Sequence, residues 1–224
     1  SIRSGSVHHA ADAASAGAGP SGALSSGSEP RRGRLDDGTR SVLFSGDIGR
    51  PNDPVLKPPV AMDGADYLVV ESTYGDRLHP PADTLDALAR VINRTAARGG
   101  VVVIPAFAVG RAQSLLHSIG QLRARGLVAD MPVYLNSPMA ANALHIYEKY
   151  QSELRLSPDE CEAMAMLPQI IDTPEQSRAL NTRKGPMIII AASGMATGGR
   201  VVHHLKAFAP HKRNTILFAG YQAG

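Results

Sequence analysis

The sequence has few of the residues that several classes of protein require. Its 224 residues include one cysteine, no tryptophan, six tyrosines and four phenylalanines. A single cysteine excludes an internal disulfide framework and a zinc knuckle built on cysteines, and so few aromatic side chains argue against an aromatic platform for stacking bases. No apolar run approaches the roughly 18 residues of a membrane-spanning helix, and residues 1–20 lack the apolar core of a secretory signal. We therefore expect a soluble protein of a reducing compartment, the cytoplasm, with no membrane partner.

The net charge carries little information. The chain has 23 basic and 20 acidic residues and a formal net charge of +3. An excess of three charges does not by itself indicate a polyanionic partner. The apolar fraction of 43% is ordinary for a globular protein, and the length suffices for a substantial core.

The first 33 residues differ in composition from the rest of the chain. They contain eight serines, seven alanines and six glycines, with only Ile2, Val7 and Leu24 as larger aliphatic side chains. Such a segment cannot bury enough apolar surface to offset its chain entropy, so we expect residues 1–33 to be flexible. The abrupt change at their end is typical of an altered reading frame in GC-rich coding DNA, or of an insertion.

The sequence from Arg34 onward alternates between short β-rich runs and helical patterns. Strands are expected at 41–45, 67–70, 101–104, 133–135, 187–191 and 215–219. Helices are expected from 83 or 84 to 98, from 111 to 125, from 138, within 155–179 where prolines interrupt the pattern, and over 200–208. Several strands are continuous apolar runs, as expected when both faces of a sheet are covered. The order predicts an α/β fold with a mostly parallel sheet and helices on both faces.

Residues with chemical potential follow the ends of these strands. Asp47 follows the first strand, Glu71 the second, and Arg111 begins a helix after the third. A glycine-rich turn at 193–199 leads from a strand into a helix, where backbone N–H groups suit a phosphate. We expect these groups to share one sheet edge. Two plainer interpretations stay open, namely that Asp47 caps its own turn and that the glycines only make a tight connection.

Two neighbouring histidines, His203 and His204, lie on the last predicted helix. Adjacent helical residues point about 100° apart, so the pair cannot easily bind one metal ion. We expect one of them to face the cleft at the strand ends and the other to face solvent.

Four stretches in this order resemble the β-CASP group of metallo-β-lactamase-fold nucleases. They are FSGDIGR (44–50), DYLVVESTYGDRLH (66–79), VVVIPAFAVGRAQ (101–113) and ASGMATGGRVVHHLK (192–206). The resemblance covers about residues 40–224. It implies that 34–80 is the end of a metallo-β-lactamase half-domain and that 81–224 is a β-CASP domain.

The resemblance also implies a function. Members of this group hydrolyse phosphodiester bonds of single-stranded RNA with two zinc ions and a metal-bridging hydroxide, and they often form homodimers. Asp47 matches a metal-bridging aspartate, and Glu71 matches an acidic residue that orients a histidine near the metals. The positions that match stretches lining the RNA cleft, and that we expect to contact phosphate, are Arg111, Ser193, Gly194, Met195, Gly198, Gly199, His203 and His204.

The chain departs from this pattern at the metal ligands. The HxHxDH motif is nowhere in the sequence, and residues 1–33 stand where a further histidine motif is expected. The two later histidine motifs are also missing, so Asp47 is the only ligand of the implied set. One carboxylate cannot hold a zinc pair, and we expect this chain alone to be inactive. The alternatives are a non-catalytic RNA-binding subunit, or a different phosphodiesterase or nucleotide-binding enzyme.

Overall fold

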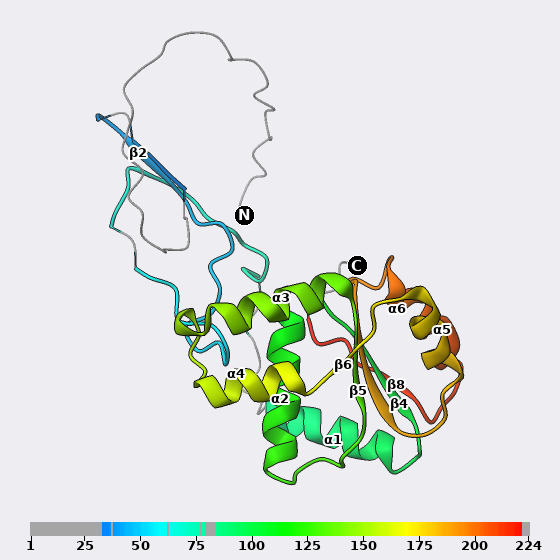
Figure 1. Cartoon of the computed structure of the whole chain (residues 1–224). Helices are drawn as coiled ribbons and strands as arrows, with labels where there is room; N and C mark the ends of the chain where they lie inside the picture. Colours follow the sequence, from blue (N-terminus) through cyan, green and yellow to red (C-terminus); the bar gives the residue numbers. More distant parts are fainter. Residues whose placement is uncertain (1–32, 37, 62, 77, 79–83, 221–224) are drawn as a thin grey trace.

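The computed structural model describes residues 33–36, 38–61, 63–76, 78 and 84–220, and the statements below concern these residues (Figure 1). The expected flexible segment therefore lies outside the described residues, apart from Gly33. The strands are β1 (Gly33–Asp36), β2 (Ser41–Phe44), β3 (Tyr67–Val69), β4 (Val101–Pro105), β5 (Val133–Asn136), β6 (Gln169–Ile170), β7 (Met187–Ala191) and β8 (Thr215–Ile216). The α-helices are α1 (Thr84–Ala96), α2 (Arg111–Ala124), α3 (Pro138–Lys149), α4 (Pro158–Met166), α5 (Pro174–Thr182) and α6 (Arg200–Phe208). A short 3₁₀ turn, η1, covers Gln151–Glu153.

Five of these strands form a parallel sheet in the order β6-β5-β7-β4-β8. The central strands β4 and β7 are buried along their whole length. Continuous burial is the physical reason that VVVIP and MIIIA are apolar at every position rather than at alternate ones. The expected mostly parallel α/β architecture is confirmed.

Helices cover both faces of this sheet. Val102, Ile104 and Ile190 face a cluster that includes buried side chains of α1, α2, α3 and α4. Val103 and Ile189 face a second cluster, closed by Val201 and Phe208 of α6 and by Leu180 of α5. Figure 1 shows α5 and α6 on one side of the sheet and the other four helices on the opposite side.

Local capping sets the starts of three helices. Ser137 caps α3, Ser157 forms a capping box with Glu160 at α4, and Thr173 does so with Gln176 at α5. In each case a proline occupies the first turn, where its missing N–H costs nothing. Pro158 and Pro174 therefore begin helices α4 and α5, whereas the sequence predicted only that they interrupt a helical stretch.

The other three strands form a separate small sheet in the order β1-β2-β3. β1 is antiparallel to β2, and β2 is parallel to β3. Figure 1 shows this sheet standing away from the helices, and all three residues of β3 are exposed. The expectation of one shared sheet is therefore wrong, because apolar runs specify strands without specifying which strands pair.

The segment after β2 returns to the larger body and is anchored there. Val55 is 1% exposed within the first cluster. The backbone of Leu56 bridges to Leu154, and Arg155 Nη1 donates to the carbonyl of Asp53 at 3.0 Å. This contact ties the connection from the small sheet to the turn between α3 and α4.

A search of the described helices found none with the length and apolar character needed to cross a bilayer.

Candidate functional site

The candidate residues fall into two groups, one for each sheet. Arg111 and the turn 193–199 lie at the carboxyl edge of the five-stranded sheet, after β4 and β7. Asp47 and Glu71 follow β2 and β3, at the carboxyl ends of the parallel pair in the small sheet. The structure thus brings Asp47 together with Glu71, and Arg111 with the turn, at two separate edges.

Glu71 joins the two loops of the small sheet. Its Oε1 accepts a hydrogen bond from the Ile48 N–H at 3.1 Å, and its Oε2 accepts one from the Thr73 hydroxyl at 2.7 Å. These bonds, that from Thr73 foremost, lower the pKa of the Glu71 carboxyl below its ordinary value. Because Asp47 directly precedes Ile48, the Glu71 contact sets the position of the loop that carries Asp47.

The described residues do not fit a zinc pair. Among them, no three His, Cys, Asp or Glu side chains are close enough together to hold a metal ion. A single zinc ion takes about four protein or water ligands, and the exposed Asp47 belongs to no group of three such side chains among the described residues. The metal chemistry implied by the family resemblance is therefore not built from these residues.

The glycine-rich turn satisfies some of its own N–H groups and leaves others free. Ser193 N donates to Gly198 O at 3.4 Å, Ala196 N to Ser193 O at 3.2 Å, and Val201 N to Ala192 O at 3.0 Å. Among the residues described, the N–H groups of Met195, Thr197 and Gly198 have no acceptor, and neither has that of Gly199. They stand immediately before α6, whose N-terminus carries partial positive charge. The turn therefore offers backbone donors to an anion.

Two glycines of the turn have no room for a side chain. A Cβ on Gly194 would lie 2.7 Å from the Phe107 ring and 2.8 Å from the Phe107 nitrogen. Gly199 has φ 76° and ψ −171°, and its Cβ would lie 2.7 Å from the carbonyl oxygen of Ala192. Only glycine adopts that backbone conformation without strain.

Arg111 and Arg200 are the cations that begin helices at this edge, and Arg200 is already bonded to Asn136 and to two carbonyl groups. Four of the five loops, 106–111, 136–139, 192–199 and 217–220, contain no aspartate or glutamate, whereas the loop after β6 contains Asp172. Arg111 is the first residue of α2 and directly follows Gly110, which has φ 80°. Its Nε would lie 3.7 Å from a Cβ placed on Gly220. No carboxylate forms an ion pair with Arg111 in the described part of the chain, so its charge is free for a ligand.

One of the two histidines is exposed to solvent, as expected, but the other is buried rather than placed in the cleft. His203 is exposed, whereas His204 is 0% exposed. Nε2 of His204 accepts from Asn136 Nδ2 at 2.6 Å, so Nδ1 carries the proton and donates to Asn181 Oδ1 at 2.6 Å. Both ring nitrogens are thus occupied, and neither contacts the turn. Burial foremost, then the charges of His203 and Arg200, lowers the pKa of His204 to about 4.

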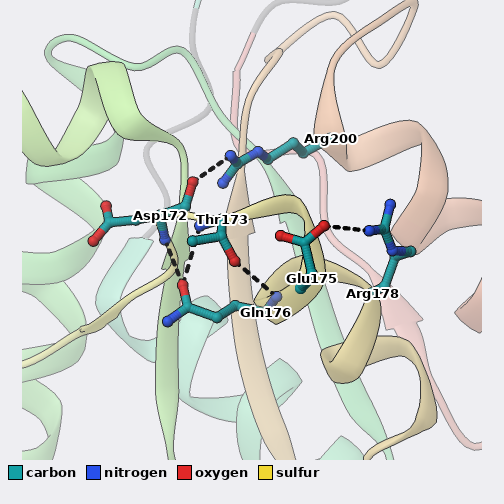
Figure 2. A network of polar contacts seen from close by, with 6 residues as sticks. All are labelled: Asp172, Thr173, Glu175, Gln176, Arg178 and Arg200. Carbon is teal, nitrogen blue, oxygen red and sulfur yellow. Dashed lines mark hydrogen bonds and ion pairs between the residues drawn. The ribbon is translucent and has the colours of Figure 1, made fainter.

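Arg200 extends this network to the strand ends. Its Nη1 donates to Asn136 Oδ1 at 2.9 Å and to the Ile171 carbonyl at 2.8 Å, and its Nη2 donates to the Asp172 carbonyl at 2.6 Å. Figure 2 shows the Arg200 guanidinium reaching the start of α5, where the Gln176 side chain accepts from the N–H groups of Asp172 and Thr173. The first residue of α6 is thereby fixed to β5 and to the segment before α5.

Sequence reasoning did not single out Asn136 and Arg200. Asn136 ends the apolar strand β5, is 0% exposed and also donates to Ser177 Oγ at 2.7 Å. A polar residue at the end of a buried strand is the one signal that could have found it, since such a group needs partners. No pattern marked Arg200 apart from its place at a helix start.

The His204 network predicts a loss of stability in acid. A histidine with a depressed folded-state pKa stabilises the fold fully above its unfolded pKa of about 6.5, and this contribution falls as the pH drops toward 4. The full contribution is about 3 kcal/mol, and more than half is lost by pH 5. Urea unfolding from pH 7 to 5 should therefore bring the stabilities of the wild type and His204→Gln closer together.

Burial also lowers the pKa of His117, but His117 is present in both the wild type and His204→Gln. Its contribution therefore cancels when their free energies of unfolding are subtracted. The exposed neighbour provides the control, because His203→Gln should lose stability in acid nearly as the wild type does, and slightly less, since the charge of His203 is only the second cause of the lowered pKa of His204. A constant gap between the wild type and His204→Gln would contradict the assignment of a neutral, buried His204.

The turn predicts unequal effects for two adjacent glycines. Gly199→Ala should destabilise the chain by roughly 1–3 kcal/mol or more, because the substitution combines a strained backbone with a collision against Ala192. Gly198→Ala should be nearly neutral, since a Cβ there meets nothing within 4 Å. Chemical unfolding of both variants is the measurement, and equal losses would argue against this turn geometry.

Comparison with known proteins identifies a domain family and several relatives. A family model described as the Beta-Casp domain matches residues 112–224, half of the chain. Ribonuclease TTHA0252 of Thermus thermophilus is 36% identical over 193 residues, which are 82% of this chain and 44% of that protein. The transcription termination factor FttA of Methanosarcina mazei is 33% identical, covering 84% of this chain and 31% of the relative.

An RNase J-like protein of Methanocaldococcus jannaschii is 33% identical, over 82% of this chain and 44% of its own length. The chain thus spans less than half the length of these relatives. The domain match covers the strands β5, β6, β7 and β8, the helices between them and the glycine-rich turn. On the strength of that match, the chain belongs to the Beta-Casp domain family.

Proposed function

We propose that this chain forms the RNA-holding part of a ribonuclease and binds single-stranded RNA at the carboxyl edge of its five-stranded sheet. The observation that carries the proposal is the set of free N–H groups at Met195, Thr197 and Gly198, beside α6 and without a carboxylate in the loops after β4, β5, β7 and β8. Phosphate oxygens are the ligands that such donors favour. Arg111 supplies the positive charge at the same edge.

The names of the relatives support RNA as the polymer. Two of them are named as ribonucleases, and a third as a transcription termination factor. Since this chain spans less than half of those proteins, hydrolysis of RNA phosphodiesters with zinc is proposed for a complete protein that carries the remaining ligands. Within that protein Asp47 would be the metal ligand contributed by this segment, with Glu71 as the residue that holds its loop.

The two ends of α2 supply a matched pair for testing the binding edge. Arg111 begins the helix at the carboxyl edge, and Arg125 follows its last turn at the opposite edge. Arg111→Ala should weaken binding of single-stranded RNA roughly tenfold, the loss expected for a charged hydrogen bond. It should also make the dependence of log affinity on log salt shallower by about 0.7, as for one phosphate contact.

Fluorescence anisotropy of labelled RNA over a range of salt concentrations measures both quantities. Arg125→Ala is the control and should change the affinity little. If the two variants weaken binding equally, the positive charge acts only through the net charge of the protein, and the proposed edge is not the site.

The missing metal ligands predict binding without cleavage. Purified chain 1–224, incubated with single-stranded RNA and excess zinc, should leave the RNA intact on a denaturing gel while retaining it in the anisotropy assay. EDTA-sensitive cleavage that follows the protein through purification would show that the chain assembles a metal centre after all.

A non-catalytic RNA-binding subunit is the second candidate, favoured by the lack of any three-residue metal-binding group among the described residues. The two candidates separate when the chain is joined to the coding sequence that flanks it. Zinc-dependent cleavage by the longer protein supports the ribonuclease, and RNA binding without cleavage supports the subunit. Tight binding of mononucleotides with no preference for RNA chains would favour a different nucleotide-binding enzyme.

A further inference from the structure

The carboxyl edge of the large sheet exposes apolar side chains beside its polar turn. Phe107 is 46% exposed, Val109 61%, Met139 66% and Phe218 49%, and they follow β4, β5 and β8. Exposed apolar groups that gather at one edge mark an interaction surface more often than isolated ones do. At this edge they surround backbone donors suited to an anion, so the ligand should combine a charged part with an apolar part.

Phe107 is the aromatic residue in direct contact with the turn. Its backbone is held on both sides, because Ala106 N donates to Ala191 O at 3.0 Å and Ala112 N donates to Phe107 O at 3.2 Å. Its ring edge lies against Gly194, where any side chain would collide with it. The close approach at Gly194 therefore fixes a half-exposed aromatic ring next to the free N–H groups of the turn.

A nucleotide unit of an unpaired strand has the matching chemistry. It joins an anionic phosphate to a flat, weakly polar base, whereas a duplex keeps its bases stacked inside. We infer that Phe107 is a stacking platform for one base of single-stranded RNA whose backbone phosphate lies on the turn 193–199. This inference rests on the proposed function and adds the residue that distinguishes an unpaired strand from a duplex.

The low aromatic content argues against an extended stacking platform but not against a single ring. Four phenylalanines in the chain argued against an aromatic platform, and an extended platform would indeed need several rings. A single base needs only one ring, provided that the ring is exposed and held in place. Phe107 meets both conditions through its 46% exposure and its contact with Gly194.

The absence of tryptophan from the sequence allows a direct optical test. Phe107→Trp introduces the single indole of the protein at the proposed platform, and stacking of a base should quench its emission. The probe is an oligouridylate of roughly ten nucleotides, within the usual range of single-strand sites. The same oligomer without bases, a ribose-phosphate chain, and an RNA duplex should cause little quenching.

Tyr150 offers the matched control position. It is 51% exposed and follows α3, which starts at the carboxyl edge and ends about 18 Å along its axis, given 12 residues at 1.5 Å each. Tyr150→Trp should keep its emission when the oligouridylate binds. Equal quenching at both positions would overturn the inference, because it would show non-specific contact with RNA.

Affinity measurements keep the test independent of the indole. Phe107→Leu retains an apolar side chain and removes the aromatic face, so it should weaken oligouridylate binding about 5- to 100-fold. Binding of the base-free oligomer should be unchanged, and Tyr150→Leu should match the wild type for both ligands. Thermal unfolding of each variant verifies that the fold is kept.

The outcomes separate this inference from the function on which it rests. If the wild type binds oligouridylate and Phe107→Leu binds it equally well, Phe107 is not a platform, although the RNA-binding edge stands. If the wild type binds neither oligouridylate nor the base-free oligomer, the proposed RNA-binding function itself fails.

Discussion

The arrangement of the candidate site depends on one buried amide, the side chain of Asn136. Its oxygen accepts from Arg200, and its nitrogen donates to His204 and Ser177. One side chain at the end of β5 therefore holds the first residue and the middle of α6, and also α5. Every polar atom of such a network must be paired, since an unpaired one in this environment costs about 1–3 kcal/mol. The N-terminus of α6, and with it the turn 193–199, is fixed as a consequence.

The same network explains why two adjacent histidines have different environments. Along a helix, neighbouring side chains diverge by about 100°, so only one of the pair can face α5 and the sheet. His204 takes that place as a neutral ring with both nitrogens bonded, and His203 is left exposed. Proximity to a glycine-rich turn in the sequence therefore does not imply contact with a ligand of that turn.

The sequence predicted the strands and helices well and their assembly less well. Apolar runs such as VVVIP and MIIIA, and caps such as Ser137, carry local information, which is why the six predicted strands are confirmed within a few residues. The short strands β1 and β6 were not predicted. The pairing of β2 with β3 in a sheet of its own has no local signal. Likewise, the partners of Asn136 come from α5 and α6. They lie at least 41 residues from it in the sequence, so no short motif could predict these contacts.

The two sheet edges also differ in how firmly their residues are held. The turn 193–199 and Phe107 stand on strands that are buried throughout, whereas Asp47 and Glu71 follow β2 and β3, and the three residues of β3 are 51–61% exposed. Catalysis requires groups held in place before the substrate arrives, because reorganising them would raise the barrier. Binding tolerates a few well-placed donors on a rigid body. The rigid large sheet therefore suits the proposed RNA-binding edge, while the carboxylates of the small sheet need further contacts to become a centre of reaction.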